Sequence, residues 1–140
     1  MIILNQKEKV GEFVGRLIGN ENPWSAYEAI GIEINGELVA GAIIDNYIEN
    51  ARCSIHCGGV GKNWLNRSFL ALVFGYVFKQ LKCNAVINIV DGNNKESLKF
   101  TEHLGFKIIY TIVGGGNNGS DAVIFEMRKK DCKWLLGDEK

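Results

Sequence analysis

A buried strand followed by a short helix, in the second half of the chain, constrains the fold more than any other feature. Residues Asn84 to Val90 form a near-continuous apolar run, which is typical of a central strand covered on both faces. After a loop from Asp91 to Asn94, Asn93 and Glu96 have the spacing of a helix capping box. Gly105 supplies the left-handed residue that commonly ends a helix. The sequence therefore predicts a strand that leads into a capped helix.

An antiparallel meander of three strands is expected before this unit. Tyr27 to Ile34 and Leu38 to Ile48 are rich in β-branched residues, and Asn35 and Gly36 between them form a strong hairpin turn. Ala51 to Cys57 has the pattern of a third strand. Because consecutive strands joined by short turns run in opposite directions, most of the sheet is expected to be antiparallel.

Two helices flank the meander in the sequence. Asn5 and Glu8 form a capping box before an amphipathic helix, whose apolar stripe contains Val10, Phe13, Val14, Leu17 and Ile18. A glycine-rich loop from Gly58 to Gly61 leads to an apolar segment from Trp64 to Leu81 with helical spacing. That second helix is expected to be largely buried.

The remaining segments add strands at both ends of the chain. Met1 to Leu4 is an edge-strand candidate, and Lys107 to Val113 and Ala122 to Met127 are strands joined by a Gly- and Asn-rich loop from Gly114 to Asp121. The predicted fold class is α/β (α+β): one domain over residues 1–140, with a mixed, mostly antiparallel sheet of six to seven strands and helices on both faces.

Composition narrows the possible functions. Sixteen basic and sixteen acidic residues cancel, so no overall charge supplies the attraction on which sequence-independent nucleic-acid binding depends. The amino terminus has a very short apolar stretch followed by charges, which is neither a signal peptide nor a membrane span. We therefore expect a cytoplasmic protein with neither a nucleic acid nor a membrane as partner.

The four cysteines are expected to be reduced thiols, because no secretion signal precedes them. They are Cys53, Cys57, Cys83 and Cys132. Cys53 and Cys57 flank His56, but the alternation of a strand places the imidazole opposite both thiols, and the spacing is not that of a zinc ribbon. No metal site is predicted.

The segment from Asn94 to Phe106 resembles the Asn-x-x-[Ala/Ser] to Leu-Gly-Phe segment of the GNAT N-acetyltransferase family. The arrangement of strands and helices resembles that family over almost the whole chain, and this segment also follows a buried strand, as the family requires. The resemblance implies that strands four and five splay apart and that acetyl-CoA is the cosubstrate. It also implies transfer of the acetyl group to a primary amine by direct attack in a ternary complex.

The family binds the pyrophosphate of acetyl-CoA with an [Arg/Gln]-x-x-Gly-x-[Gly/Ala] loop, where backbone N–H groups and a helix dipole converge on the anion. The family spacing, counted back from Asn94, implies that this loop consists of Lys62, Asn63, Trp64, Leu65, Asn66 and Arg67. Leu65 and Arg67 stand where the family has small residues, and Lys62 and Arg67 supply cations instead. Trp64 to Arg67 and Met127 to Leu135 also resemble short GNAT proteins of phages and prophages and the RimJ/RimL-like branch.

The same resemblance implies that the pantetheine arm pairs with backbone from Ile55 to Cys57, where an N–H group polarises the thioester carbonyl. The attacking amine must lose a proton, and His56 is the best candidate base because an imidazole titrates near neutral pH. A histidine packed and hydrogen-bonded within the sheet is the alternative. Asp45, Asp91 and Glu33 are weaker candidates for the base.

The general acid and the acceptor side are less defined. Thr101 stands where many family members have a tyrosine that protonates the thiolate, which leaves Ser97, Tyr110 or water for that role. Trp24 and Tyr27 border the acceptor cleft in this fold, although aromatic residues serve equally well as core.

The sequence is therefore consistent with two functions. The first is an N-acetyltransferase for an amine-bearing small molecule or protein, with a homodimer as its possible assembly. The second is a catalytically reduced GNAT-fold protein that acts as a CoA-binding, regulatory or protein-interaction module, which the altered loop and Thr101 favour.

Overall fold

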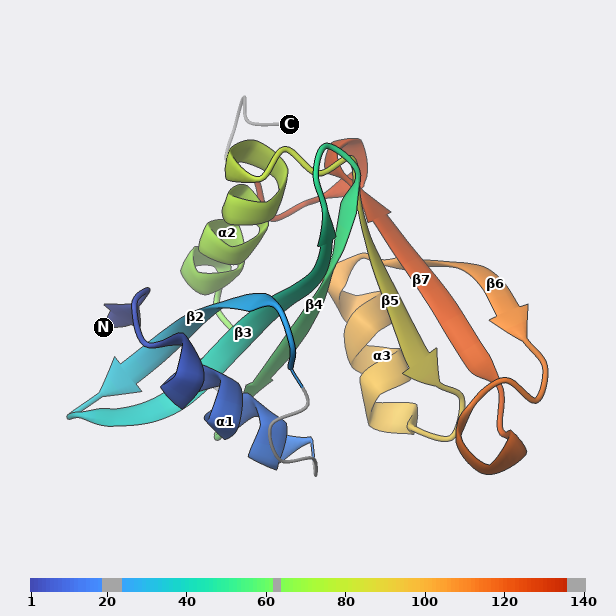
Figure 1. Ribbon diagram of the computed structural model, residues 1–140, viewed down its shortest axis with the longest axis horizontal. Helices are drawn as coiled ribbons and strands as arrows, with labels where there is room; N and C mark the ends of the chain where they lie inside the picture. Colours follow the sequence, from blue (N-terminus) through green and yellow to red (C-terminus); the bar gives the residue numbers. More distant parts are fainter. Residues whose placement is uncertain (19–23, 62–63, 136–140) are drawn as a thin grey trace.

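A computed structural model describes residues 1–18, 24–61 and 64–135 (Figure 1). Within them, seven strands form one sheet in the order β1-β2-β3-β4-β5-β7-β6. The strands are β1 (Ile2–Ile3), β2 (Tyr27–Ile34), β3 (Glu37–Ile48), β4 (Arg52–Gly59), β5 (Ala85–Asp91), β6 (Lys107–Ile112) and β7 (Ala122–Arg128). The helices are α1 (Lys7–Leu17), α2 (Arg67–Gly75) with its π-helical continuation η1 (Tyr76–Gln80), and α3 (Lys95–Leu104). Single 3₁₀ turns occur at Asn117–Gly119 and Lys129–Asp131.

The β2–β3 hairpin has the turn that its sequence predicts. Asn35 and Gly36 have φ values of 54° and 82°, so both central residues are left-handed, as a two-residue primed turn requires. The strands then pair without interruption from Tyr27↔Asp45 to Ile32↔Ala40, and the register shifts once, between Ile32 and Glu33.

Helix α1 covers one face of β2, β3 and β4 (Figure 1). Val10 and Val14 are buried and pack with Ala29 and Ile43. The helix lies close to the sheet because Gly41 has no side chain: a Cβ there would lie 2.7 Å from Val10 Cγ1. The glycine thus sets the distance between helix and sheet.

Helices α2 and α3 cover the opposite face and enclose the main core. The fully buried Phe74 of α2 lies 6.3 Å, ring centre to ring centre, from Phe106 at the end of α3. Alternate β3 residues Ala42 and Ile44 belong to this core, whereas Ile43 between them faces α1. The prediction of helices on both faces of a mixed sheet is confirmed.

Strands β4 and β5 form a parallel pair that soon separates. Only Arg52↔Ala85 and Cys53↔Val86 are paired, and the two strands diverge beyond them (Figure 1). The other strand pairs of the sheet are antiparallel. The splay that the family resemblance implies is therefore present.

Two predicted caps are wrong by one residue. The first helical hydrogen bond of α1 joins Val10 N–H to the Gln6 carbonyl at 3.0 Å, so Gln6 is the N-cap and Asn5 lies one residue outside. Gln6 makes no side-chain cap bond. At α3 the cap is Asn94 instead of Asn93, because Asn94 Oδ1 accepts from the Ser97 N–H at 3.1 Å.

The second helix is shorter and less uniform than predicted. It begins at Arg67, because Asn66 Oδ1 accepts from the Phe69 N–H at 2.9 Å. After Gly75 it widens into a π-helical turn, in which Leu81 N–H donates to the Tyr76 carbonyl at 2.8 Å. One stripe is buried, but Leu72 is exposed.

Strand β5 is covered on both faces only in its first half. Ala85 and Val86 are buried, but Ile89 is 66% exposed. Ile89 lies opposite Ile124 of β7, and α1 does not extend over β5 (Figure 1). No helix in the described ranges is long and apolar enough to cross a membrane.

Candidate active site

A cleft of about 250 Å³ opens where β4 and β5 diverge. Its walls come from β4, β5 and α3, with Ile18 at the end of α1. We call it the splay cleft; its lining residues are Ile18, Ile55, His56, Cys57, Asn88, Ile89, Val90, Asp91, Asn94, Ser97, Phe100, Thr101, Leu104 and Phe106. The splay cleft thus brings together the predicted His56 and Ser97 with Ile55, Cys57 and Asn94.

His56 forms a pair with Asp45 at the edge of the splay cleft. Its Nε2 lies 2.9 Å from Asp45 Oδ1. Because an ionised carboxylate only accepts hydrogen bonds, Nε2 carries the proton and donates it, which leaves the lone pair of a neutral imidazole on Nδ1. The Trp24 ring lies 4.9 Å from the imidazole, centre to centre, and its Nε1–H donates to the Gly11 carbonyl at 2.8 Å. His56 therefore has a fixed orientation and one basic nitrogen.

Asn88 joins the two diverging strands through its side chain. Its Oδ1 accepts from the Ile55 N–H at 3.0 Å, and its Nδ2 donates to the Ile55 carbonyl at 2.9 Å. Nearer the paired end, Ser54 Oγ donates to the Ile87 carbonyl at 2.7 Å. Side chains thus replace backbone pairing at the point where the strands part.

Asp91, at the end of β5, connects the splay cleft to the loop between β6 and β7. Its carboxylate accepts from the N–H groups of Asn93 and Asn117, both at 2.9 Å, and from the Ser120 hydroxyl at 2.8 Å. These donors hold the pKa of the Asp91 carboxyl below its usual value, with the Asn93 N–H as the largest cause. Asp91 is therefore an ionised anchor and not a strong base.

Cys57 lies in the cleft wall but is a poor nucleophile. Burial raises the pKa of its thiol to about 12, so the thiolate is scarce at neutral pH. Cys53 lies deeper in the core, and burial raises its pKa further. All four cysteines carry free thiols.

Helix α3 forms the third wall. Asn94 caps the helix, and Ser97 lies in its first turn. Thr101 is 5% exposed, and its hydroxyl donates to the Ser97 carbonyl at 2.7 Å. The Thr101 hydroxyl is thus held by the helix backbone.

The predicted pyrophosphate loop lies before α2 and is partly packed into the core. The structure does not describe Lys62 and Asn63. Trp64 packs on Gly59, where a Cβ would lie 2.5 Å from the indole, and its ring is 6.4 Å from that of Phe100 in the cleft wall. Leu65 packs against the main core, and Asn66 caps the helix.

Arg67 and the other candidates lie outside the splay cleft. The Arg67 guanidinium donates to the Lys133 carbonyl at 3.0 Å. The Tyr27 hydroxyl donates to the Lys7 carbonyl at 3.3 Å, beside α1. Glu33 is ion-paired with Lys9, and Tyr110 is exposed on the edge strand β6. None of these four predicted residues lines the splay cleft, although Tyr27 lies opposite Asp45 in the β2–β3 register.

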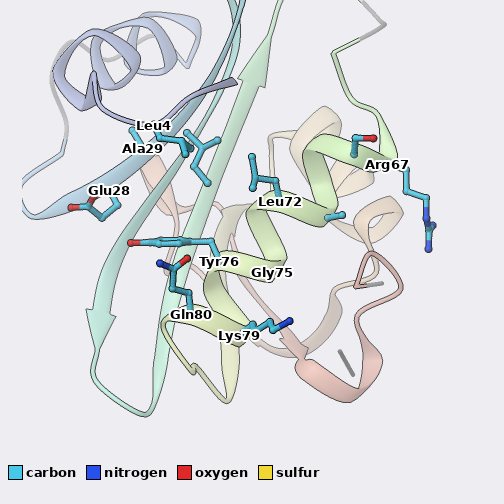
Figure 2. Close-up of a pocket in the computed structure, with 12 residues that line it drawn as sticks. Leu4, Glu28, Ala29, Arg67, Leu72, Gly75, Tyr76, Lys79 and Gln80 are labelled. Carbon is cyan, nitrogen blue, oxygen red and sulfur yellow. The ribbon is translucent and has the colours of Figure 1, made fainter. Parts of the chain in front are cut away.

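A larger cavity of about 870 Å³ lies between β2 and α2. Figure 2 shows Leu4 and Ala29 on one side of this β2–α2 cavity and Leu72, Gly75 and Tyr76 on the other. Of the predicted site residues that the structure describes, Arg67 alone lines it, and its guanidinium points away (Figure 2). The smaller splay cleft is the candidate active site, because His56 of the His56–Asp45 pair and the diverging edge of β4 line it.

Sequence reasoning missed Asn88 and the role of Asp91. Asn88 is the only polar side chain between Ala85 and Val90, which was a usable signal in an otherwise apolar strand. The bond from Asp91 to Asn117 joins residues 26 positions apart, and no short-range pattern predicts it.

The splay between β4 and β5, with α3 after β5, defines the GNAT fold. A variant of the spermidine N-acetyltransferase SpeG from Vibrio cholerae matches with a TM-score of 0.68 and 16% identity, over 97% of this chain and 98% of that one. The Campylobacter jejuni N-acetyltransferase PseH, in complex with acetyl coenzyme A, matches with a TM-score of 0.56 and 14% identity, over 76% and 70% of the two chains. A putative acetyltransferase from T. thermophilus matches with a TM-score of 0.61 and 17% identity, over 84% and 65%. No protein-family model and no curated protein sequence matches the chain.

Proposed function

We propose that this protein is an acetyl-CoA-dependent N-acetyltransferase that acetylates a primary amine. The observation that carries the proposal is the His56–Asp45 pair at 2.9 Å, beside the splay cleft between β4 and β5. Similarity in fold to the acetyltransferases above supports the donor. The sequences at Trp64–Arg67 and before Leu135 support a place in the short phage-type or RimJ/RimL-like branch.

The donor arm would lie along the open edge of β4. Ile55 directs its N–H and C=O toward β5, where Asn88 binds them. Because backbone groups alternate along a strand, Cys57 and then Gly59 direct theirs toward the same side. The Cys57 N–H would donate to the thioester carbonyl and stabilise the negative charge that develops there.

The residues that flank this edge of β4 would carry out the proton transfers of the acetyl-transfer reaction. The amine nitrogen attacks the thioester carbonyl carbon, its proton passes to His56 Nδ1, and the carbon–sulfur bond breaks to release CoA thiolate. Asp45 is a positioning residue that fixes the imidazole tautomer. With the Thr101 hydroxyl bonded to the Ser97 carbonyl, water or the Ser97 hydroxyl would protonate the thiolate.

The phosphates of the donor would meet the starts of two helices. Helices α2 and α3 begin after the loops that follow β4 and β5, and helix N-termini favour anions. Lys62 and Asn63 are proposed as further contacts, together with Trp64, Leu65, Asn66 and Arg67. Arg67 would have to leave the Lys133 carbonyl to reach a phosphate.

Release of CoA thiol tests this proposal directly. With acetyl-CoA and a panel of primary amines that begins with spermidine, the substrate of the SpeG enzyme, thiol is expected to appear in proportion to acetylated amine. His56→Gln is expected to lower kcat/KM by roughly 10²–10⁴-fold and to remove the rise of kcat/KM with pH that deprotonation of the imidazole causes.

His103→Gln is the matched control, since His103 is the only other histidine and is exposed in the last turn of α3. This control is expected to keep the activity and the pH profile. An unchanged pH profile in His56→Gln would remove His56 from the mechanism. Binding of acetyl-CoA without transfer to any amine would favour the catalytically reduced, CoA-binding module instead.

A further inference from the structure

The Asn88 carboxamide occupies the position of a peptide unit between β4 and β5. A parallel neighbour would normally accept from the Ile55 N–H and donate to its C=O through backbone groups. Here one side chain does both, at 3.0 and 2.9 Å. The hydrogen-bonding edge of β4 is therefore already filled at Ile55.

This bridge defines how deep a donor arm can pair with β4. The next backbone groups that face the opening belong to Cys57, two residues or about 6.6 Å further along the strand. His56 lies between these two residues and directs its side chain to the other face, toward Asp45. A thioester stopped at Cys57 is thus held one residue from the proposed base.

We propose that Asn88 forms the floor of the splay cleft, fixes the thioester at Cys57 and thereby limits the transferred acyl group to the size of acetyl. The inference rests on the proposed function, because it concerns the donor of that same reaction. Asn88 is a specificity-determining residue, because an acyl group held at Cys57 would extend toward the carboxamide that fills the next pairing position, at Ile55.

The surroundings of Asn88 suit a longer acyl chain once the carboxamide is removed. Ile55, Leu104 and Phe106 line the same cleft and are nearly fully buried apolar residues. Additional methylene groups would gain contact with these side chains in place of water. Truncation of Asn88 should therefore favour longer acyl donors over acetyl-CoA.

Calorimetric titration with acetyl-CoA and butyryl-CoA tests the inference without an identified acceptor. The wild-type protein is expected to bind acetyl-CoA more tightly than butyryl-CoA. In Asn88→Ala the ratio of the two Kd values is expected to move toward butyryl-CoA by about tenfold, because added methylenes in an apolar pocket have effects of this size. A general loss of stability would weaken the binding of both CoA esters equally and leave the ratio of their Kd values unchanged.

Ser54→Ala is the matched control, because it removes the neighbouring cross-strand bond to the Ile87 carbonyl and leaves Asn88 in place. In Ser54→Ala the ratio of the Kd values for acetyl-CoA and butyryl-CoA is expected to equal that of the wild type. If Asn88→Ala does not fold, Asn88→Ser gives a smaller truncation with the same expected direction. If a folded Asn88 variant has the same ratio of the two Kd values as the wild type, the inference is overturned and the proposed function is unaffected. If the wild-type protein binds neither CoA ester, both are overturned.

Discussion

At the scale of single residues, Asp91 is the point where the splay cleft and the β6–β7 loop depend on each other. Its two carboxylate oxygens accept from three donors, and Asn117 and Ser120 both belong to the loop. An amide in this position would present an NH₂ group to one of these donors. Charge and geometry at Asp91 thus both contribute to the order of the loop.

Asp91→Asn is expected to lower Tm at pH 7. The native pKa of Asp91 is lowered, so the unfolded chain binds the proton more readily. The stabilisation is therefore present above about pH 4, where an unfolded aspartate is ionised, and is lost as the pH falls through the lower native pKa. The Tm difference between variant and wild type, measured by thermal denaturation, should shrink under acidic conditions.

The exposed Asp131→Asn provides the control for the change of charge. Asp131→Asn is expected to leave Tm near the wild-type value both at pH 7 and under acidic conditions. A difference for Asp91→Asn that stays constant down to pH 2 would contradict the role assigned to its ionised form.

The sequence predicts residue types better than residue contacts. His56 was predicted as the base from its imidazole and its place at a strand end, and Ser97 was one of the groups left for the general acid by Thr101. Both line the splay cleft. The bridge from Asn88 to Ile55 was not predictable, because it exists only where two strands 33 positions apart diverge by the reach of one side chain. The partner of His56, Asp45, required the β3–β4 register.

At the scale of elements, the junction of β4 and α2 depends on close packing of Trp64. The indole lies against Gly59, the last residue of β4, and an added Cβ would lie 2.5 Å from the ring. The ring also contacts Phe69 of α2, at 6.2 Å between centres. A side chain at position 59 would therefore displace the indole from its place between strand and helix.

Gly59→Ala is expected to destabilise the fold by about 1–3 kcal/mol, as overpacking typically does. Gly75→Ala is the matched control, since Gly75 has helical φ and ψ of −62° and −42° and open space around its Cα. That variant is expected to be neutral or more stable by about 0.4–1 kcal/mol, because alanine reduces the freedom of the unfolded chain. Urea denaturation of both proteins measures the difference, and equal stabilities would contradict the packing argument.

Element types were more predictable than element ends. The Asn35–Gly36 turn and the left-handed Gly105, with φ of 109°, have strong local signatures and were predicted correctly. The π-helical turn after Gly75 was not predicted, because the sequence from Tyr76 to Gln80 keeps helical periodicity. Adjacent asparagines at positions 93 and 94 left the choice of cap open to the tertiary structure.

At the scale of the whole molecule, the order of elements predicted the mixed sheet and the family resemblance predicted its splay. The sequence did not predict that the larger cavity would lie elsewhere. The β2–α2 cavity of about 870 Å³ lies between two elements that are distant in the sequence, and no local pattern predicts it. Size alone would select this cavity, whereas the His56–Asp45 pair and the diverging strands select the splay cleft.

The location of acyl-CoA binding is the central claim, and an amide NMR titration with acetyl-CoA tests it most directly. The expected result is a set of saturable shifts at Cys57, Gly59, Asn94 and Ser97, which surround the splay cleft or continue its β4 edge. Amides at Ala29, Leu72 and Gly75, which line the β2–α2 cavity, should stay unchanged. Shifts confined to those three residues, or none at millimolar acetyl-CoA, would contradict the assignment of the active site.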